Sequence, residues 1–589
     1  MTATTRAAMT NRENHSPTHG MRILLCRCPE RHGRQDLDQT AEILAGWGIS
    51  VRLVDALCER ETFSTEVSET ALRDVERLVI GACSPFLIGD LLDQALRDHP
   101  DLRWTLVDLK DARDAVALSG ILRSRLQALD PAFFKTCGFP SAGLSYGALR
   151  PLGAKAPRRV LVVGGGVGGC QAALDLAGMG IPVTLVETED SLGGNMARLD
   201  KTFPTLDCSI CILGPRLVDA ASHPQITVLA SSRVKRISGR PGHFLAEIEH
   251  RPRYVDMNVC SGCGACSDVC PVIVPSTWNA GLRPRKAVGI VFEQAVPLRA
   301  AIQKDYCIEC GLCEKACERK AIRLAEEPHV SRLHTAAVVL AEGARLFKAS
   351  RLGSYGYGRF PEVLTNLEFE RLVCATGPTQ GALITPSGCR PRSVAFIQCA
   401  GSRNRRFLPY CSITCCTASI KEAMLVLEHE PEAAVTIFFN DIRTAGKSFE
   451  GLLLRARERG VRFIKALPDR VERAPDGKRL SVHYRAASQP GIQSLEADLV
   501  VLAVGVEPPN ADHRWVVRTP PRRDRYGFYE EAFYWGGQMH STVPGIFLIG
   551  GCHGPRDITQ TVIEASAAAA HVAKWLRRIS ASPSKGSQP

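Results

Sequence analysis

Two cysteine runs between residues 260 and 317 constrain this chain more than any other feature. Each run has the spacing C-x2-C-x2-C-x3-C, and the eight residues are Cys260, Cys263, Cys266, Cys270, Cys307, Cys310, Cys313 and Cys317. Three thiolates of such a run can wrap one [4Fe–4S] cube while the fourth reaches the neighbouring cube. Zinc sites seldom use a fourth cysteine in this register, and nothing indicates a secreted disulfide scaffold. The runs therefore predict a pair of [4Fe–4S] clusters.

Length and charge narrow the class of protein further. The 589 residues suffice for several domains, and the 23 cysteines fall mostly in groups, as expected of metal and redox chemistry in a reducing compartment. We expect a cytoplasmic protein without a transmembrane segment, because no long apolar run occurs. The net charge of +12 comes from scattered arginines, so no nucleic-acid partner is predicted.

The first 150 residues predict a small domain with a possible metal site. After a flexible tail, strands are expected over residues 22–26, 49–54 and 77–81, with a helix over 36–47. Four cysteines lie at or just beyond the strand ends: Cys26, Cys28, Cys58 and Cys83. Strand ends converge on one edge of such a sheet, so these thiols can hold another cluster. The alternative is that some are small buried apolar residues.

A dinucleotide-binding turn is predicted next. A strand over residues 159–163 runs into a turn with Gly164, Gly166 and Gly169, and a helix over 170–178 follows. Glycines let the backbone approach a pyrophosphate, and the helix N-terminus offers it free N–H groups.

Further residues make FAD the expected dinucleotide. Glu187 closes the following strand at the spacing where a carboxylate binds ribose hydroxyls. Gly193 and Gly194 come shortly after it, as in flavoproteins with two dinucleotide-binding domains. A distant segment resembles the second FAD-contacting strand and helix of that superfamily, through Gly550, Gly551, Asp557 and Ile558.

The segment between these halves should be a pyridine-nucleotide domain, but its glycine turn is missing. A strand beginning at Ser393 ends at a cysteine instead, so we expect the nicotinamide site to be lost. Four cysteines gather here: Cys399, Cys411, Cys415 and Cys416. They predict a cluster beside the flavin, and the alternative is a redox disulfide between the adjacent pair.

Over residues 21–578 the chain resembles the A-subunit family of CoB–CoM heterodisulfide reductase, whose members are FAD and iron–sulfur proteins. The resemblance rests on the glycine turn, the paired cysteine runs, residues 202–213, residues 353–359 and the Cys399–Cys416 group. It implies an α/β, thioredoxin-reductase-like flavoprotein with two dinucleotide-binding domains, an inserted bacterial-type 2[4Fe–4S] ferredoxin domain and an N-terminal α/β domain.

The expected domains follow from this resemblance. They are a tail (1–20), the N-terminal domain (21–150), the first part of the FAD domain (151–250), the ferredoxin insertion (251–326), the FAD-domain return (327–388), the degenerate pyridine-nucleotide domain (389–505), the last FAD part (506–578) and a tail (579–589).

The resemblance also implies a role in electron transfer. Family members pass electrons between ferredoxin-like or hydrogenase-type donors and a disulfide-reducing partner, and some split electron pairs at the FAD. We expect FAD, about four [4Fe–4S] clusters, other subunits of a heterodisulfide-reductase-like complex, and an electron exit through one of them. A homodimer is one arrangement that the sequence allows.

Some assignments stay open. Lys421 matches a lysine expected near the isoalloxazine, where a cation could stabilise reduced flavin; the alternative is a solvated helix charge. Cys208 and Cys211 fit a redox dithiol, cluster ligands or a turn without redox role. The rival functions are an NAD(P)H oxidoreductase like the glutamate synthase small subunit and a zinc-holding scaffold.

Overall fold

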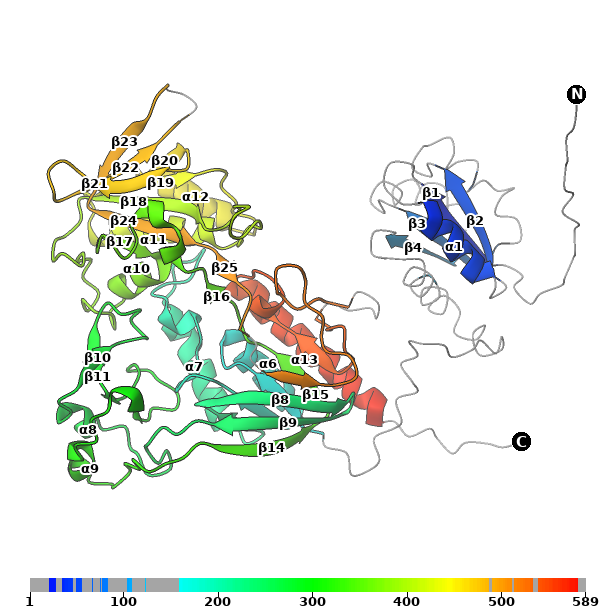
Figure 1. Cartoon of the computed structure of the whole chain (residues 1–589), viewed down its shortest axis with the longest axis horizontal. Helices are drawn as coiled ribbons and strands as arrows, with labels where there is room; N and C mark the ends of the chain where they lie inside the picture. Colours follow the sequence, from blue (N-terminus) through cyan, green and yellow to red (C-terminus); the bar gives the residue numbers. More distant parts are fainter. Residues whose placement is uncertain are drawn as a thin grey trace, which may run out of the picture. The chain divides into compact units, whose positions relative to one another are not determined.

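The computed structural model describes residues 21–27, 34–45, 49–55, 66, 75, 77–82, 103–108, 122, 158–486, 490–510, 513–532 and 539–580. The chain divides into two compact units, residues 1–149 and 150–589. Each unit is described by itself, and Figure 1 shows the elements of both.

The first unit contains a parallel four-stranded sheet. Its elements are β1 (Met21–Arg27), α1 (Arg34–Ala45), β2 (Ser50–Asp55), β3 (Arg77–Ala82) and β4 (Arg103–Asp108), and the strand order is β2-β1-β3-β4. Ile23, Leu24 and Leu25 of β1 are fully buried, as expected for a central parallel strand. The three predicted strands and the helix are confirmed to within two residues. Cys26 is buried on β1, whereas Cys28, Cys58 and Cys83 lie outside the described residues.

The second unit contains two parallel sheets with the same topology. The first has the order β27-β15-β5-β6-β7 and the second has the order β17-β24-β18-β19-β20. In each, the first strand of a doubly wound fold lies at the centre, with the next two strands on one side. This arrangement confirms the predicted α/β fold with two dinucleotide-type domains.

The elements of the first sheet and its helices are β5 (Val160–Val163), α6 (Val167–Gly178), β6 (Val183–Val186), η2 (Met196–Arg198), α7 (Ser209–Ser222), β7 (Ile226–Leu229), β15 (Ala337–Leu340), β27 (Ile546–Leu548) and α13 (Ile558–Ser580). Helices α6 and α13 pack against each other beside this sheet (Figure 1), although they are almost 400 residues apart in sequence.

The second sheet is built from β17 (Val363–Thr365), α10 (Asn366–Val373), β18 (Ser393–Ala400), α11 (Cys415–His429), β19 (Ala434–Phe439), α12 (Phe449–Glu458), β20 (Arg462–Lys465) and β24 (Leu499–Val504). A small antiparallel sheet of β21 (Arg470–Arg473), β22 (Leu480–Tyr484) and β23 (Gln493–Ala497) follows β20. The two halves are joined by connections that pair as β16 (Arg345–Leu346) and β25 (Val506–Glu507).

The cysteine-rich insertion leaves and re-enters the FAD half at one place. It follows β9 (His243–His250) and precedes β14 (His329–Thr335), which pair antiparallel in a sheet with β8 (Ser232–Arg240) and β26 (Arg514–Val516). The insertion itself contains α8 (Ala265–Asp268), β10 (Ile273–Pro275), β11 (Pro284–Lys286), β12 (Val288–Gly289), β13 (Ala301–Ile302), η3 (Lys304–Tyr306) and α9 (Leu312–Ala316). It forms its own small lobe in Figure 1.

Candidate functional site

The turn between β5 and α6, which we call the glycine loop (residues 164–169), leaves no room for a side chain at Gly164 or Gly169. Gly164 has φ +108°, and a Cβ there would lie 2.3 Å from the carbonyl oxygen of Ala341. A Cβ on Gly169 would lie 1.8 Å from the carbonyl oxygen of Gly164. Gly166 is the N-cap of α6 in an extended conformation. The loop therefore presents backbone and a helix N-terminus, which suits a pyrophosphate.

Glu187 follows β6 and is held against the glycine loop. Its carboxylate accepts hydrogen bonds from the backbone N–H of Gly165 (2.7 Å) and of Glu189 (2.8 Å), and from the hydroxyl of Thr188 (3.1 Å). Burial raises the pKa of Glu187, and these hydrogen bonds oppose that rise. Each carboxylate oxygen can accept more than one hydrogen bond, so the group can also bind a ribose hydroxyl.

The remaining predicted FAD residues converge on the same region. The N–H of Gly193 donates to the carbonyl of Gly165 (2.9 Å). A Cβ on Gly551 would lie 2.8 Å from the backbone nitrogen of Ala344, just after β15. Asp557 caps α13 by accepting from the N–H of Gln560 (2.7 Å), and Ile558 is the first residue of that helix. Gly194 and Gly550 both have positive φ, +55° and +64°.

One cavity in the insertion is lined by cysteines of both runs. Its lining includes three cysteines of the second run and the last cysteine of the first, which are Cys270, Cys307, Cys310 and Cys313. We call this group the second cube site. The crossing of Cys270 to the other run is the ligand exchange that two-cube ferredoxins use.

The other cysteines of the insertion surround the first run. Burial raises the pKa of the Cys266 thiol to about 11, and the charges of the nearby Cys260 and Cys313 add to this rise. The backbone N–H of Gly262 donates to Cys260 Sγ (3.4 Å), and that of Ala321 donates to Cys317 Sγ (3.2 Å). Such N–H···S contacts suit thiolates that carry cluster charge.

The two loops have matching backbones. Gly262 and Gly264 of the first run have φ of +75° and +87°, and Glu309 and Gly311 at the corresponding places of the second have +55° and +70°. In the part of the chain that the structure describes, no three His, Cys, Asp or Glu side chains are placed to hold a single metal ion.

A second group of thiols lies where β18 meets α11, in what we call the cysteine loop (residues 399–416). Cys399 has φ +56° at the end of β18, and Cys415 and Cys416 open α11. Burial raises the pKa of these three thiols, and the charge of Cys411 raises each of them further. Cys411 Sγ also accepts from the N–H of Ile413 (3.4 Å). The four thiols therefore form one group.

Basic side chains flank this thiol group. Arg403 donates to the Cys399 thiol and lowers its pKa against the effect of burial, and the charge of Arg443 acts in the same direction on Cys416. Arg403 also pairs with Asp441. Four thiols, a helix N-terminus and two guanidinium groups make a site suited to an anionic cluster.

Lys421 is buried rather than solvated. Only 1% of its surface is exposed, and its ammonium pairs with Glu370 of α10. Glu370 also accepts from the N–H of Asp200 (2.9 Å), which lies in the segment after Gly193 and Gly194. Glu422 is buried beside them and accepts from the side-chain amide of Asn366 (2.6 Å). The alternative of a solvated helix charge is therefore wrong, and a position beside flavin stays a prediction.

Two buried groups at this junction were not found from the sequence. Arg371, 1% exposed, donates to the side-chain oxygen of Asn279 in the insertion (3.0 Å) and to the carbonyl of Arg198 in the FAD half (3.2 Å). Gln398 is buried next to Cys399, and neither polar atom of its amide has a partner among the described residues. No periodicity or spacing marks either residue.

Two family models match the chain. Residues 159–205 match a model described as FAD dependent oxidoreductase, and residues 253–318 match a 4Fe-4S dicluster domain. These segments contain the glycine loop and both cysteine runs. The fold and the sites together define an oxidoreductase that holds FAD and [4Fe–4S] clusters and transfers electrons.

Similar proteins narrow the class. The A-subunit of the H(2):CoB-CoM heterodisulfide,ferredoxin reductase of Methanothermobacter thermautotrophicus is 38% identical over 85% of this chain and 76% of its own length. The iron–sulfur A-subunit of the CoB–CoM heterodisulfide reductase of Methanocaldococcus jannaschii is 43% identical over 70% of this chain and 63% of its own. The chain belongs to the A-subunit family of heterodisulfide reductase.

The similarity to solved structures and the search for membrane-spanning helices add little to the functional assignment. The thioredoxin reductase of T. acidophilum is 15% identical, covers 71% of this chain and 98% of its own, and has a TM-score of 0.42, which is too low to assign function. Within the described residues, none of the helices combines the length and apolarity that a bilayer crossing requires.

Proposed function

We propose that this chain is the electron-transfer subunit of a heterodisulfide-reductase-like complex in the cytoplasm. It would move electrons between ferredoxin- or hydrogenase-type donors and a separate disulfide-reducing subunit, and it would split electron pairs at its FAD. The observation that carries the proposal is the presence, in one compact unit, of the glycine loop, the second cube site and the cysteine loop. The absence of a glycine turn at Cys399 counts against the NAD(P)H alternative.

The residues present fit these cofactors. Gly164, Gly166 and Gly169 would hold the pyrophosphate of FAD, and Glu187 its ribose. The cysteines of the insertion and of the cysteine loop would ligate three cubes, and the N-terminal cysteines a fourth. Bound FAD would supply the exchange between two-electron and one-electron steps. The protein would position these groups, with Cys415 and Lys421 buried away from water and Arg403 and Arg443 beside the charge of a cysteine-loop cluster.

The surface of the insertion indicates where a partner binds. Large apolar side chains around the second cube site are exposed by 40% to 65%: Val269, Ile273, Tyr306, Ile308 and Leu312. At the places of Ile308 and Leu312 the first run has Ser261 and Ala265. Lys304 and Glu309 of the same segment pair with each other at 2.6 Å. Several large exposed apolar side chains on one small lobe suit contact with a protein subunit.

Metal and flavin analysis of anaerobically purified protein tests the proposal. About sixteen irons and one FAD per chain would support four cubes. About twelve irons would support three cubes and contradict the N-terminal cluster. About eight irons would confine clusters to the insertion and contradict the cysteine-loop cluster.

Reduction of the flavin by NADH or NADPH would instead establish the rival oxidoreductase. A redox titration in which the two one-electron potentials of FAD fall in the ordinary order would contradict electron splitting.

Partner binding has its own test. Ile308→Ser should slow electron exchange with the disulfide-reducing partner by at least about tenfold while leaving iron content unchanged, because it removes an exposed contact and no ligand. Ile492→Ser is the matched control, since Ile492 is also half exposed but lies at the antiparallel sheet. Equal rates in the two variants would contradict the assigned surface.

A further inference from the structure

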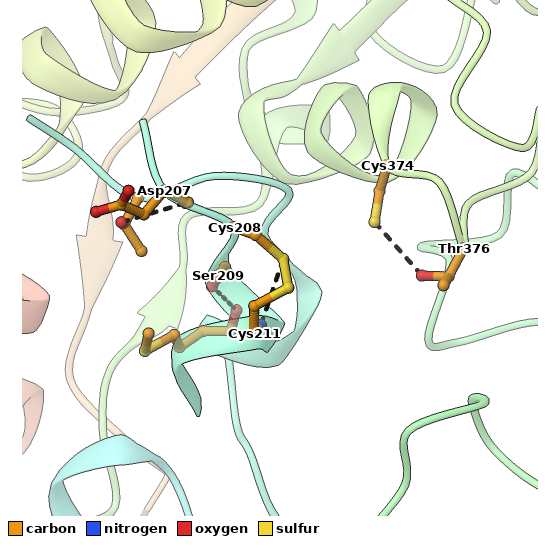
Figure 2. Close-up of a disulfide and its surroundings, with 8 residues drawn as sticks. Asp207, Cys208, Ser209, Cys211, Cys374 and Thr376 are labelled. Atoms are coloured by element: carbon orange, nitrogen blue, oxygen red, sulfur yellow. Dashed lines mark hydrogen bonds between the residues drawn. A yellow bond between two sulfur atoms is a disulfide. The ribbon is translucent and has the colours of Figure 1, made fainter. Parts of the chain in front are cut away.

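The structure joins Cys208 and Cys211 in a disulfide at the start of α7 (Figure 2). Cys208 is the N-cap of this helix, and its sulfur accepts from the N–H of Cys211 at 3.3 Å. Among the described residues the other cysteines, seventeen in number, are free thiols. Among the cysteines that the structure describes, only this pair is joined.

This disulfide adds little to the fold. It links residues three apart within one helical turn that is already fixed by its own contacts. The N–H of Ser209 donates to the carbonyl of Asp200 (2.9 Å), and its hydroxyl donates to the carbonyl of Met196 (2.7 Å). A crosslink that closes so short a loop constrains the unfolded chain least. In reducing compartments such disulfides are usually catalytic rather than structural.

The two sulfurs differ in accessibility. Cys211 is exposed and Cys208 is half-buried. A helix N-terminus stabilises a thiolate, so Cys208 is the better leaving group and Cys211 is the sulfur that an incoming thiolate can reach. Ser209, between the two cysteines, is hydrogen-bonded to Met196 and Asp200. Both of these residues belong to the segment that follows Gly193 and Gly194, so the disulfide is held next to that segment.

The surface beside Cys211 is apolar. Along α7, Ile212 is 42% exposed and Val218 is 54% exposed, and Pro215 between them is exposed as well. Cys211, Pro215 and Val218 share one helical face, since they are four and three residues apart. Side chains of this kind suit contact with a protein segment around a disulfide more than contact with a small charged thiol.

We propose that Cys208 and Cys211 form a redox-active dithiol that exchanges with a disulfide of a partner protein. In the reduced chain, the Cys211 thiolate attacks the partner disulfide and releases one partner thiolate. Cys208 then attacks Cys211 Sγ, the mixed disulfide breaks, and the second partner thiolate leaves. The chain gains a disulfide and the partner gains two thiols, so two electrons and two protons pass to the partner. The proposal adds to the function above and takes from it only the reducing compartment.

A redox titration of the intact protein tests whether Cys208 and Cys211 interconvert between dithiol and disulfide. The cofactor-loaded chain is equilibrated anaerobically with reduced and oxidised dithiothreitol, quenched in acid and alkylated with N-ethylmaleimide. Mass spectrometry of the peptide containing residues 208–211 should show both thiols becoming labelled together in one two-electron transition. Labelling at every ratio, or at none, would overturn the proposal.

Single variants test the order of attack. With a cyclic disulfide peptide as the probe, Cys208→Ser should accumulate a mixed disulfide on Cys211, and Cys211→Ser should form it at least about tenfold more slowly. Cys389→Ser is the control, because Cys389 is an exposed free thiol elsewhere and should change nothing. A loss of about four irons in either variant would identify Cys208 and Cys211 as cluster ligands and overturn the proposal.

Discussion

The two parallel sheets of the second unit share one strand order but carry different loops at the same place. In the FAD half, β5 leads through the glycine loop to α6; in the other half, β18 leads through the cysteine loop to α11. Both first strands lead into a residue with positive φ, Gly164 at +108° and Cys399 at +56°. The shared topology therefore places the two loops at the same point of each sheet, and the loop decides whether that point presents backbone N–H groups or thiols.

The largest expected effect comes from breaking the cysteine loop. Cys416→Ser should remove one cube, about four irons per chain, and leave FAD in place, because the thiolate at the start of α11 is lost while the glycine loop is untouched. Iron and flavin analysis measures both. Cys389→Ser, an exposed cysteine outside the loop, should keep all its iron. Unchanged iron in Cys416→Ser would mean that the cysteine loop holds thiols only.

Breaking the glycine loop should give the opposite result. Gly169→Ala places a Cβ 1.8 Å from the carbonyl oxygen of Gly164, so the turn must deform and FAD occupancy should fall at least about tenfold. The iron content should stay unchanged, because the glycine loop contains none of the predicted cluster ligands. Gly178→Ala on the same helix meets nothing within 4 Å and should retain FAD. If Gly169→Ala retained its flavin, the glycine loop would not be the site of the dinucleotide.

Much of the difference between the two halves could be predicted from the sequence, because its signals are local. The strands, the glycine spacing and the C-x2-C-x2-C-x3-C runs need only neighbouring residues, and the structure has the elements where expected. Arg371, Gln398 and the pair of Lys421 with Glu370 could not be predicted. Their roles arise when segments up to 173 residues apart meet at the junction of the halves and the insertion.

A buried ion pair between α10 and α11, within the cysteine-loop half, is what the next substitution tests. Lys421→Met leaves Glu370 without its ammonium partner, at a cost of about 3–5 kcal/mol, or roughly a 3–6 °C fall in the thermal midpoint for a unit of this length. The double variant Lys421→Met/Glu370→Gln removes both charges and should recover part of that loss. Calorimetry of the cofactor-loaded chain measures the midpoints. A fall of less than about 2 °C in the single variant would contradict a stabilising role for the pair.

The smallest expected effect is a pH dependence confined to the cysteine-loop half. Burial and the nearby Glu370 raise the pKa of Glu422 well above its usual value of 4.5, so the folded state binds a proton that the unfolded state releases near that value. Stability from this group is therefore present at low pH and falls as pH rises toward the folded pKa. Glu422→Gln should flatten the decline of the thermal midpoint between about pH 5 and 8, because its amide stays neutral. Glu432→Gln, at an exposed position after α11, should keep the slope of the unmodified chain, and an equal slope in Glu422→Gln would show that another group titrates.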